Sequence, residues 1–214
     1  MTQTGRLKIV NLGLPKTGTT TFARALQEAG LFVADHRVRG EHTDDTRIRR
    51  DFVGAGIYTS WYATGNPLEL LDFYDALTEI SGLKPPLALF PQCDYALLKA
   101  MRDKNPDVKF VTTTRPPEAI CASMDNFRNM GKRVAQANMP GLPHGFGKNW
   151  TERVTWIETM LDMHRDVFAG RDNYLQLDVG APDAAEKLSA FIGMPLPWWG
   201  RENVTQPPGG DPVA

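Results

Sequence analysis

Residues 7–22 read LKIVNLGLPKTGTTTF, an apolar, β-branched run followed by a loop rich in glycine and threonine. The run at 7–14 predicts a buried strand that ends before the turn-forming Pro15. Apolar residues at helical spacing then predict a helix over 19–29, which stops at Gly30. This order of strand, glycine loop and helix is the strongest constraint on the fold, because repeated units of this kind build a parallel sheet covered by helices.

The rest of the chain continues the alternation of strands and helices. Further strands are predicted at 31–35, 108–113 and 174–179, and the run LALF at 87–90 is either a strand or a packed loop. Helices are predicted over 67–78, 95–103, 117–127, 149–168 and 184–192. The sequence therefore predicts an α/β fold, in which a parallel sheet carries helices on both faces.

The predicted domain organisation is simple. A chain of 214 residues suits a single domain. We assign residues 1–205 to this α/β domain and expect the turn-rich segment 206–214 to be a flexible C-terminal tail. Residues 129–148 are rich in Gly, Pro and Met, and they are expected to form an irregular excursion or lid.

Composition argues against several classes of function. The formal net charge of -1 gives no bulk reason to expect a nucleic-acid partner or a charged membrane surface. No apolar run approaches the roughly 20 residues that a membrane-spanning helix needs, so no membrane span is expected. Cys93 and Cys121 have neither disulfide-framework nor metal-ligand spacing. We therefore expect a cytoplasmic protein without a metal site.

The glycine loop is suited to an anionic group. Consecutive amides that end at a helix N-terminus form a cradle of donors in a favourable dipole, and Gly18 allows close approach of the backbone. The candidate binding residues are Lys16, Thr17, Gly18, Thr19, Thr20 and Thr21. The common triphosphate loop has its lysine directly after a glycine, whereas Lys16 follows Pro15. A polar strand-to-helix turn with a threonine N-cap remains the alternative interpretation.

The stretch PKTGTTT at 15–21 resembles the 5′-phosphosulfate-binding loop of the sulfotransferase family, whose pattern is close to PKxGTTxL. In that family the loop holds 3′-phosphoadenosine 5′-phosphosulfate (PAPS), and its lysine reaches the bridge between phosphate and sulfate. The family's second motif is an arginine at a strand end followed eight residues later by a serine, both of which bind the donor's 3′-phosphate. Arg115 and Ser123 match this motif after the predicted strand at 108–113.

The chain is similar to small bacterial sulfotransferases over nearly all of residues 7–205. The C-terminal likeness rests on WIETMLDMHRDVF, on YLQLDV and on EKLSAFIGMPLPWWGREN. The resemblance implies a P-loop-type sheet and PAPS-dependent transfer of a sulfo group to a hydroxyl or amine. The acceptor would be a small molecule or a glycan. The Gly-x-x-Gly-x-x-Lys element of the mammalian relatives has only a partial counterpart, GFGK at 145–148.

Such a transfer needs charge stabilisation and a general base. The resemblance implies that Lys16 stabilises the leaving phosphate. We predict His36 as the base, because it lies just past a predicted strand end and imidazole titrates near neutrality. Asp35 and Glu41 are the alternative candidates.

Two other functions remain open. A P-loop kinase of small molecules would need an acid for Mg²⁺, for which Asp35 is the candidate, and a donor-binding protein would lack catalysis altogether.

Overall fold

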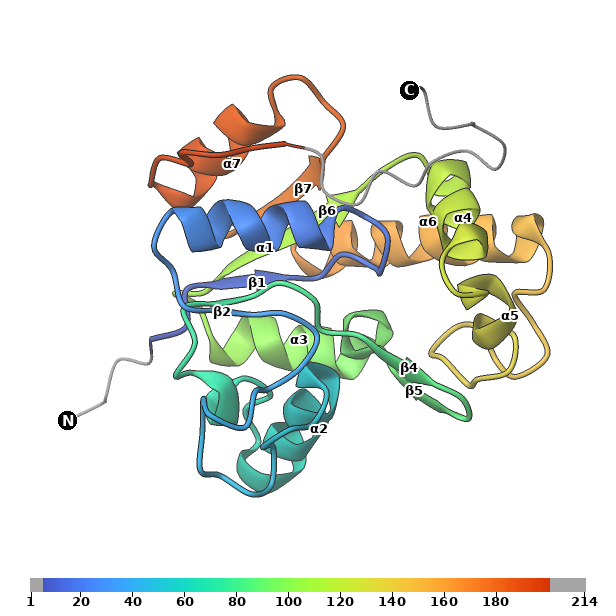
Figure 1. The fold of residues 1–214 in the computed structure, drawn as a ribbon, viewed down its shortest axis with the longest axis horizontal. Coiled ribbons are helices and arrows are strands. Elements are labelled where there is room, and N and C mark those ends of the chain that lie inside the picture. The colour runs from blue at the N-terminus through green and yellow to red at the C-terminus, as the bar shows by residue number, and fades with distance from the viewer. Residues whose placement is uncertain (1–5, 201–214) are drawn as a thin grey trace, which may run out of the picture.

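The computed structural model describes residues 6–200, whose centre is a five-stranded sheet (Figure 1). Across the sheet the strands are β2 (Val33–Ala34), β3 (Ala76–Leu77), β1 (Ile9–Asn11), β6 (Lys109–Thr114) and β7 (Tyr174–Asp178). All neighbouring pairs are parallel. This arrangement confirms the predicted α/β class with a parallel sheet. The expected flexible tail, 206–214, lies outside the described residues.

The connections between the strands supply the helices and a small hairpin. The helices are α1 (Thr19–Glu28), α2 (Val53–Thr64), α3 (Tyr95–Lys104), α4 (Pro117–Asn126), α5 (Met130–Val134), α6 (Trp150–Val167) and α7 (Ala184–Ile192). Two 3₁₀ turns, η1 (Glu69–Leu71) and η2 (Pro91–Cys93), and an antiparallel hairpin of β4 (Gly82–Lys84) and β5 (Leu87–Leu89) complete the described elements. Within residues 6–200, no helix has both the length and the hydropathy that crossing a bilayer requires.

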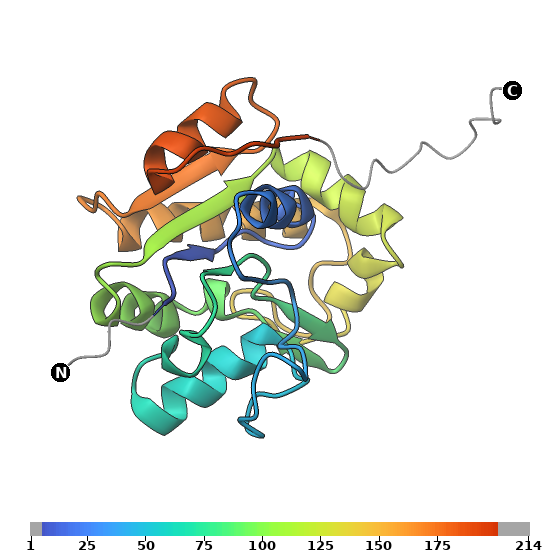
Figure 2. The same cartoon turned by 60° about the vertical axis from the view of Figure 1, so that its left-hand side comes forward.

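Both faces of the sheet are covered, as the alternation of side chains along its strands requires. Ile9 and Val111 point to one face and pack in a cluster with residues of α1 and α7. Val10 and Phe110, their neighbours in sequence, point to the other face and pack with residues of α2 and α3. Figures 1 and 2 show α1 and α7 on one side of the sheet and α2 and α3 on the other.

The helix predicted over 67–78 is wrong. That segment forms the short turn η1 and then enters the sheet as β3. Its buried apolar residues Leu68, Leu71, Tyr74 and Leu77 repeat every three positions, a spacing that imitates a helix. The chain extends at β3 because two-sided pairing with β1 and β2 satisfies its backbone in the sheet interior.

Helix α2 differs from the prediction, whereas the run at 87–90 takes one of its two predicted forms. The sequence did not predict α2, because it carries Gly54 and Gly56, which are poor helix formers. Both positions are buried, and a Cβ on Gly54 would lie 2.6 Å from the carbonyl oxygen of Ile80. The run at 87–90 contains a strand, β5, but this strand pairs with β4 outside the central sheet. The excursion at 129–148 contains the short helix α5.

Candidate active site

The carboxyl ends of four strands meet at one edge of the sheet, and the segments after them line a cavity of about 640 Å³. The segment after β1 contributes Lys16, the one after β2 His36, the one after β3 Glu79 and the one after β6 Arg115. Ser123 of α4 lies in the same wall. Ligands of open parallel sheets bind at this edge, so the cavity is the candidate active site.

The loop between β1 and α1 has the backbone shape of an anion cradle. Lys16 and Gly18 both adopt the left-handed conformation, with φ of 76° and 90°. A Cβ on Gly18 would approach Val179 to 2.8 Å, so conformation and space both favour glycine there. Helix α1 then begins at Thr19, with no acidic residue in its first turn. The positive end of the helix dipole therefore faces the cavity, and no carboxylate within the first turn of α1 competes for it.

Asn11 anchors this loop to both neighbouring strands. Its side-chain amide donates to the carbonyl of Thr78, just beyond β3, at 2.9 Å. Its side-chain oxygen accepts the backbone N–H of Gly13 at 2.9 Å and that of Thr113, in β6, at 3.2 Å. These groups are fully buried, so the network holds the start of the loop at a fixed place between β3 and β6.

The side chain of Thr17 stabilises the loop through hydrogen bonds within the protein. Its side chain is buried, and its hydroxyl donates to the carbonyl of Leu14 at 2.7 Å and lies 2.8 Å from the hydroxyl of Thr113. The structure therefore places the Thr17 hydroxyl among protein groups, whereas the sequence suggested it as a ligand donor. The other predicted loop residues line the cavity, namely Lys16, Gly18, Thr19, Thr20 and Thr21.

Replacing Gly13 by alanine tests this support. A Cβ at Gly13 would lie 2.1 Å from the hydroxyl oxygen of Thr113 and 2.6 Å from that of Thr17. We expect Gly13→Ala to lower the free energy of unfolding by about 1–3 kcal/mol through overpacking, measured by urea denaturation. Gly180→Ala is the control, since its Cβ would meet nothing closer than the flexible Asp178 carboxylate at 3.3 Å. Equal stability of both variants would contradict the packing described here.

The charges in the cavity act on one another. Burial lowers the pKa of Lys16, and the positive charge of Arg115 lowers it further, whereas Glu79 opposes both effects. The Lys16 ammonium also lies 4.0 Å from the centre of the Phe127 ring, within cation–π distance. The ammonium is thus held where an anion on the loop would meet it.

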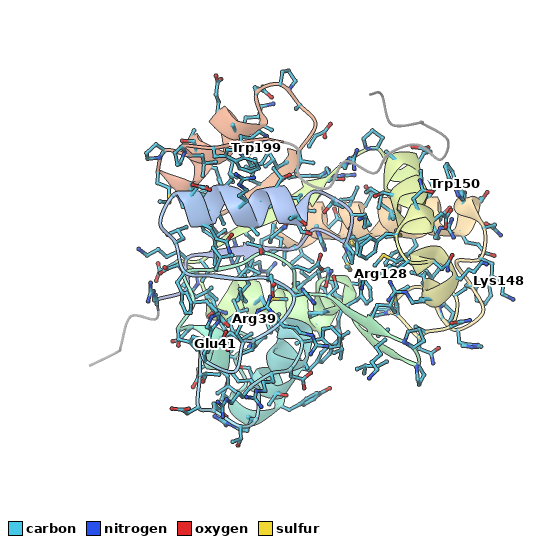
Figure 3. The ribbon with its side chains drawn as sticks, viewed as in Figure 1. Arg39, Glu41, Arg128, Lys148, Trp150 and Trp199 are labelled. Carbon is cyan, nitrogen blue, oxygen red and sulfur yellow. The ribbon has the colours of Figure 1, made fainter. Side chains whose placement is uncertain are left out.

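The three candidate bases predicted from the sequence differ in their position relative to the cavity. His36 lines the cavity, but half of its side chain is exposed, and its Nδ1 is 3.7 Å from the Asp35 carboxylate. Asp35 also lines the cavity, where its carboxylate accepts from the backbone of Arg37 and pairs with Arg39. Glu41 is not part of the cavity lining. Figure 3 shows Glu41 well to the side of the cavity residue Arg128.

Glu79 is the candidate residue that the sequence analysis missed. It lies just beyond β3, in the cavity wall, and its Oε1 accepts the backbone N–H of Ser81 at 3.2 Å. Burial raises the pKa of Glu79 to about 7, although hydrogen bonds from Ser81 and Thr19 favour the charged form. Glu79 directly follows the segment DALT at 75–78, but the helix predicted over 67–78 concealed the strand end there.

Comparison with known proteins agrees with this fold. Residues 8–176 match the family model of the sulfotransferase domain. Among solved structures, the chain is similar to a sulfotransferase from Alicyclobacillus acidocaldarius, with a TM-score of 0.51 and 15% identity over 94% of this chain and 87% of that one. No curated protein sequence matches the chain. At this identity the structural likeness speaks for the fold, and the family model, which spans most of the chain, shows that the protein belongs to the sulfotransferase family.

Proposed function

We propose that this sulfotransferase takes its sulfo group from PAPS and passes it to a hydroxyl or amine of a small-molecule or glycan acceptor. One observation carries the proposal. The anion-binding loop with Lys16 and the pair of Arg115 and Ser123 come from distant parts of the sequence, yet they line one cavity at one edge of the sheet. PAPS carries anionic groups at both its 5′ and its 3′ end, and these two clusters offer a site for each.

The order of the strands supports one orientation of the donor. The loop follows β1, and Arg115 follows the adjacent strand β6. The 5′-phosphosulfate would lie on the loop amides and Lys16, while the 3′-phosphate would meet Arg115 and Ser123. Arginine suits the second position because its guanidinium forms paired, charge-assisted bonds to phosphate oxygens. This orientation leaves the β3 side of the loop to the acceptor.

The wall on the β3 side has the character of an acceptor site. Phe52, Leu83 and Met130 contribute apolar surface there. Arg133 of α5 also lines this wall, and its guanidinium donates to the carbonyl of Leu83 at 3.1 Å. Apolar surface next to a cation favours an acceptor that combines an apolar face with polar or anionic groups.

The transfer itself is a displacement at sulfur. The acceptor oxygen or nitrogen forms a bond to sulfur, the bond between sulfur and the bridging phosphate oxygen breaks, and that oxygen keeps the electron pair. The product 3′-phosphoadenosine 5′-phosphate (PAP) leaves with the added negative charge. Lys16 and the amides at the start of α1 would stabilise this charge as it develops, in the manner of fixed donors around a leaving phosphate.

Binding of PAP tests the choice of donor. We expect PAP at about 100 times its Kd to stabilise the protein by about 2.7 kcal/mol, which raises Tm by about 5–10 °C. AMP, which lacks the 3′-phosphate, should produce a clearly smaller shift at the same concentration. No shift with millimolar PAP would refute the proposal. A larger shift with ATP and Mg²⁺ than with PAP would instead favour a kinase.

A further inference from the structure

Glu79 occupies a distinctive place in the cavity. In the sheet, β1 lies between β3 and β6, so the loop with Lys16 separates Glu79 from Arg115. If the donor lies across the loop and Arg115, as proposed above, Glu79 is on the side that remains for the acceptor. The opposing influence of Glu79 on the pKa of Lys16 shows that the two charges interact. The carboxylate therefore shares the cavity with the group that would hold the leaving phosphate.

The Glu79 carboxylate is fixed from two directions. Thr19, the first residue of α1, and Ser81 both form hydrogen bonds with it. The hydroxyl of Ser81 accepts from the fully buried side chain of Gln92 at 2.7 Å. The carbonyl of Gln92 lies 2.7 Å from Nε2 of His164 in α6, and since a carbonyl can only accept, this nitrogen carries the proton. The segment after β3 is thus connected through Gln92 to the buried His164 of α6.

We propose that Glu79 is the general base that takes the proton from the acceptor, an inference that rests on PAPS-dependent transfer. In this step the carboxylate accepts the proton of the acceptor O–H or N–H while the acceptor atom forms its bond to sulfur. The electron pair of the broken S–O bond goes to the leaving phosphate of PAP. The protonated Glu79 then releases its proton to solvent after the products leave, which restores the carboxylate.

Burial gives Glu79 a base strength that suits this task. A glutamate with a pKa of about 7 is a much stronger base than an ordinary exposed glutamate, yet it is largely ionised slightly above neutral pH. Asp35 also faces it with a negative charge, and Lys16 faces it with a positive one. General bases work best when their pKa lies near the working pH.

His36 is less well placed for the same role. It follows β2, which is the edge strand, whereas Glu79 follows β3, the strand paired directly with β1. Half of the His36 side chain is exposed, and its Nδ1 lies 3.7 Å from the Asp35 carboxylate. The strand order therefore favours Glu79, one strand closer to the loop, over the histidine that the sequence suggested.

The experiment compares Glu79→Gln with the wild type in two assays. Release of PAP from PAPS is followed with water as acceptor and with 2-naphthol added, and PAP affinity is measured by calorimetry. We expect Glu79→Gln to lower the rate of release by about 100- to 10,000-fold and to leave the Kd for PAP unchanged or lower, because a negative charge is removed. Glu158→Gln, an exposed substitution on α6, is the matched control and should behave as the wild type.

The pH dependence of kcat/KM distinguishes a general base from a residue that has only a structural role. The wild-type kcat/KM should rise about tenfold per pH unit below an apparent pKa near 7 and then level off, since the carboxylate is the active form. This limb should vanish in Glu79→Gln and persist in His36→Asn. The inference is overturned if Glu79→Gln releases PAP within threefold of the wild type, if it loses PAP affinity tenfold, or if His36→Asn removes the limb. A wild type that binds PAP without releasing it from PAPS also overturns the inference, whereas failure to bind PAP refutes the proposed donor itself.

Discussion

Replacing Lys16 by methionine is expected to lower kcat for sulfo transfer by about 100- to 1,000-fold, the cost of removing one fixed donor from a developing anion. The Lys16 ammonium lies in the cavity at the loop, where burial and the positive charge of Arg115 lower its pKa, so a bound anion would stabilise its charged form. Methionine retains an unbranched, apolar side chain that can still pack on Phe127, so the loss should be one of charge. Since both residues carry a Cβ, the left-handed backbone at this position is strained equally in both.

The measurement is single-turnover release of PAP from PAPS at saturating donor, together with the Tm of each variant. Lys187→Met is a matched control, because Lys187 lies on α7 and pairs with Asp183 at the surface. We expect the control to keep wild-type kcat and Lys16→Met to keep a wild-type Tm within about 3 °C. A Lys16→Met variant with more than a tenth of wild-type kcat would show that the loop amides stabilise the leaving group without the ammonium.

Local motifs explain why much of the candidate site could be predicted from the sequence. The loop at 15–21 and the pair of Arg115 and Ser123 each follow a strand-forming run, and both are short motifs that resemble those of the sulfotransferase family. The parallel sheet then brings the ends of β1 and β6 to the same edge. The structure accordingly places both predicted motifs in one cavity.

Predicting Glu79 as the general base would have required the order of the strands, which local sequence patterns do not contain. Strand β3 has two residues and follows apolar side chains at helical spacing, so nothing nearby marked Glu79 as lying at a strand end. The order of β2, β3 and β1 is set by crossover connections between distant segments. His36 followed a strand that the sequence revealed, but that strand is at the edge of the sheet. Likewise, the glycines of α2 serve close packing, which only the tertiary structure makes evident.

Arg115 is expected to act on donor binding, which distinguishes it from Lys16. We predict that Arg115→Ala raises the Kd for PAP about 100-fold, equivalent to about 2.7 kcal/mol, and leaves kcat at saturating PAPS within about threefold. The side chain is exposed at the mouth of the cavity, where it can reach a phosphate without first breaking a buried ion pair. Ser123→Ala should raise the same Kd by about fivefold, the effect of one neutral hydrogen bond.

A ligand without a 3′-phosphate tells whether Arg115 binds that group or serves the loop. Arg115 also lowers the pKa of Lys16, so it influences the 5′ end of the site through charge. If Arg115 binds the 3′-phosphate, Arg115→Ala strongly weakens the binding of PAP. The affinity for AMP, which is lower in the wild type, stays nearly unchanged. Equal weakening of both ligands would assign Arg115 to the loop and would remove the 3′-phosphate site from this wall. Arg171→Ala, outside the cavity lining, controls for general loss of positive charge, and calorimetry at fixed salt keeps screening constant.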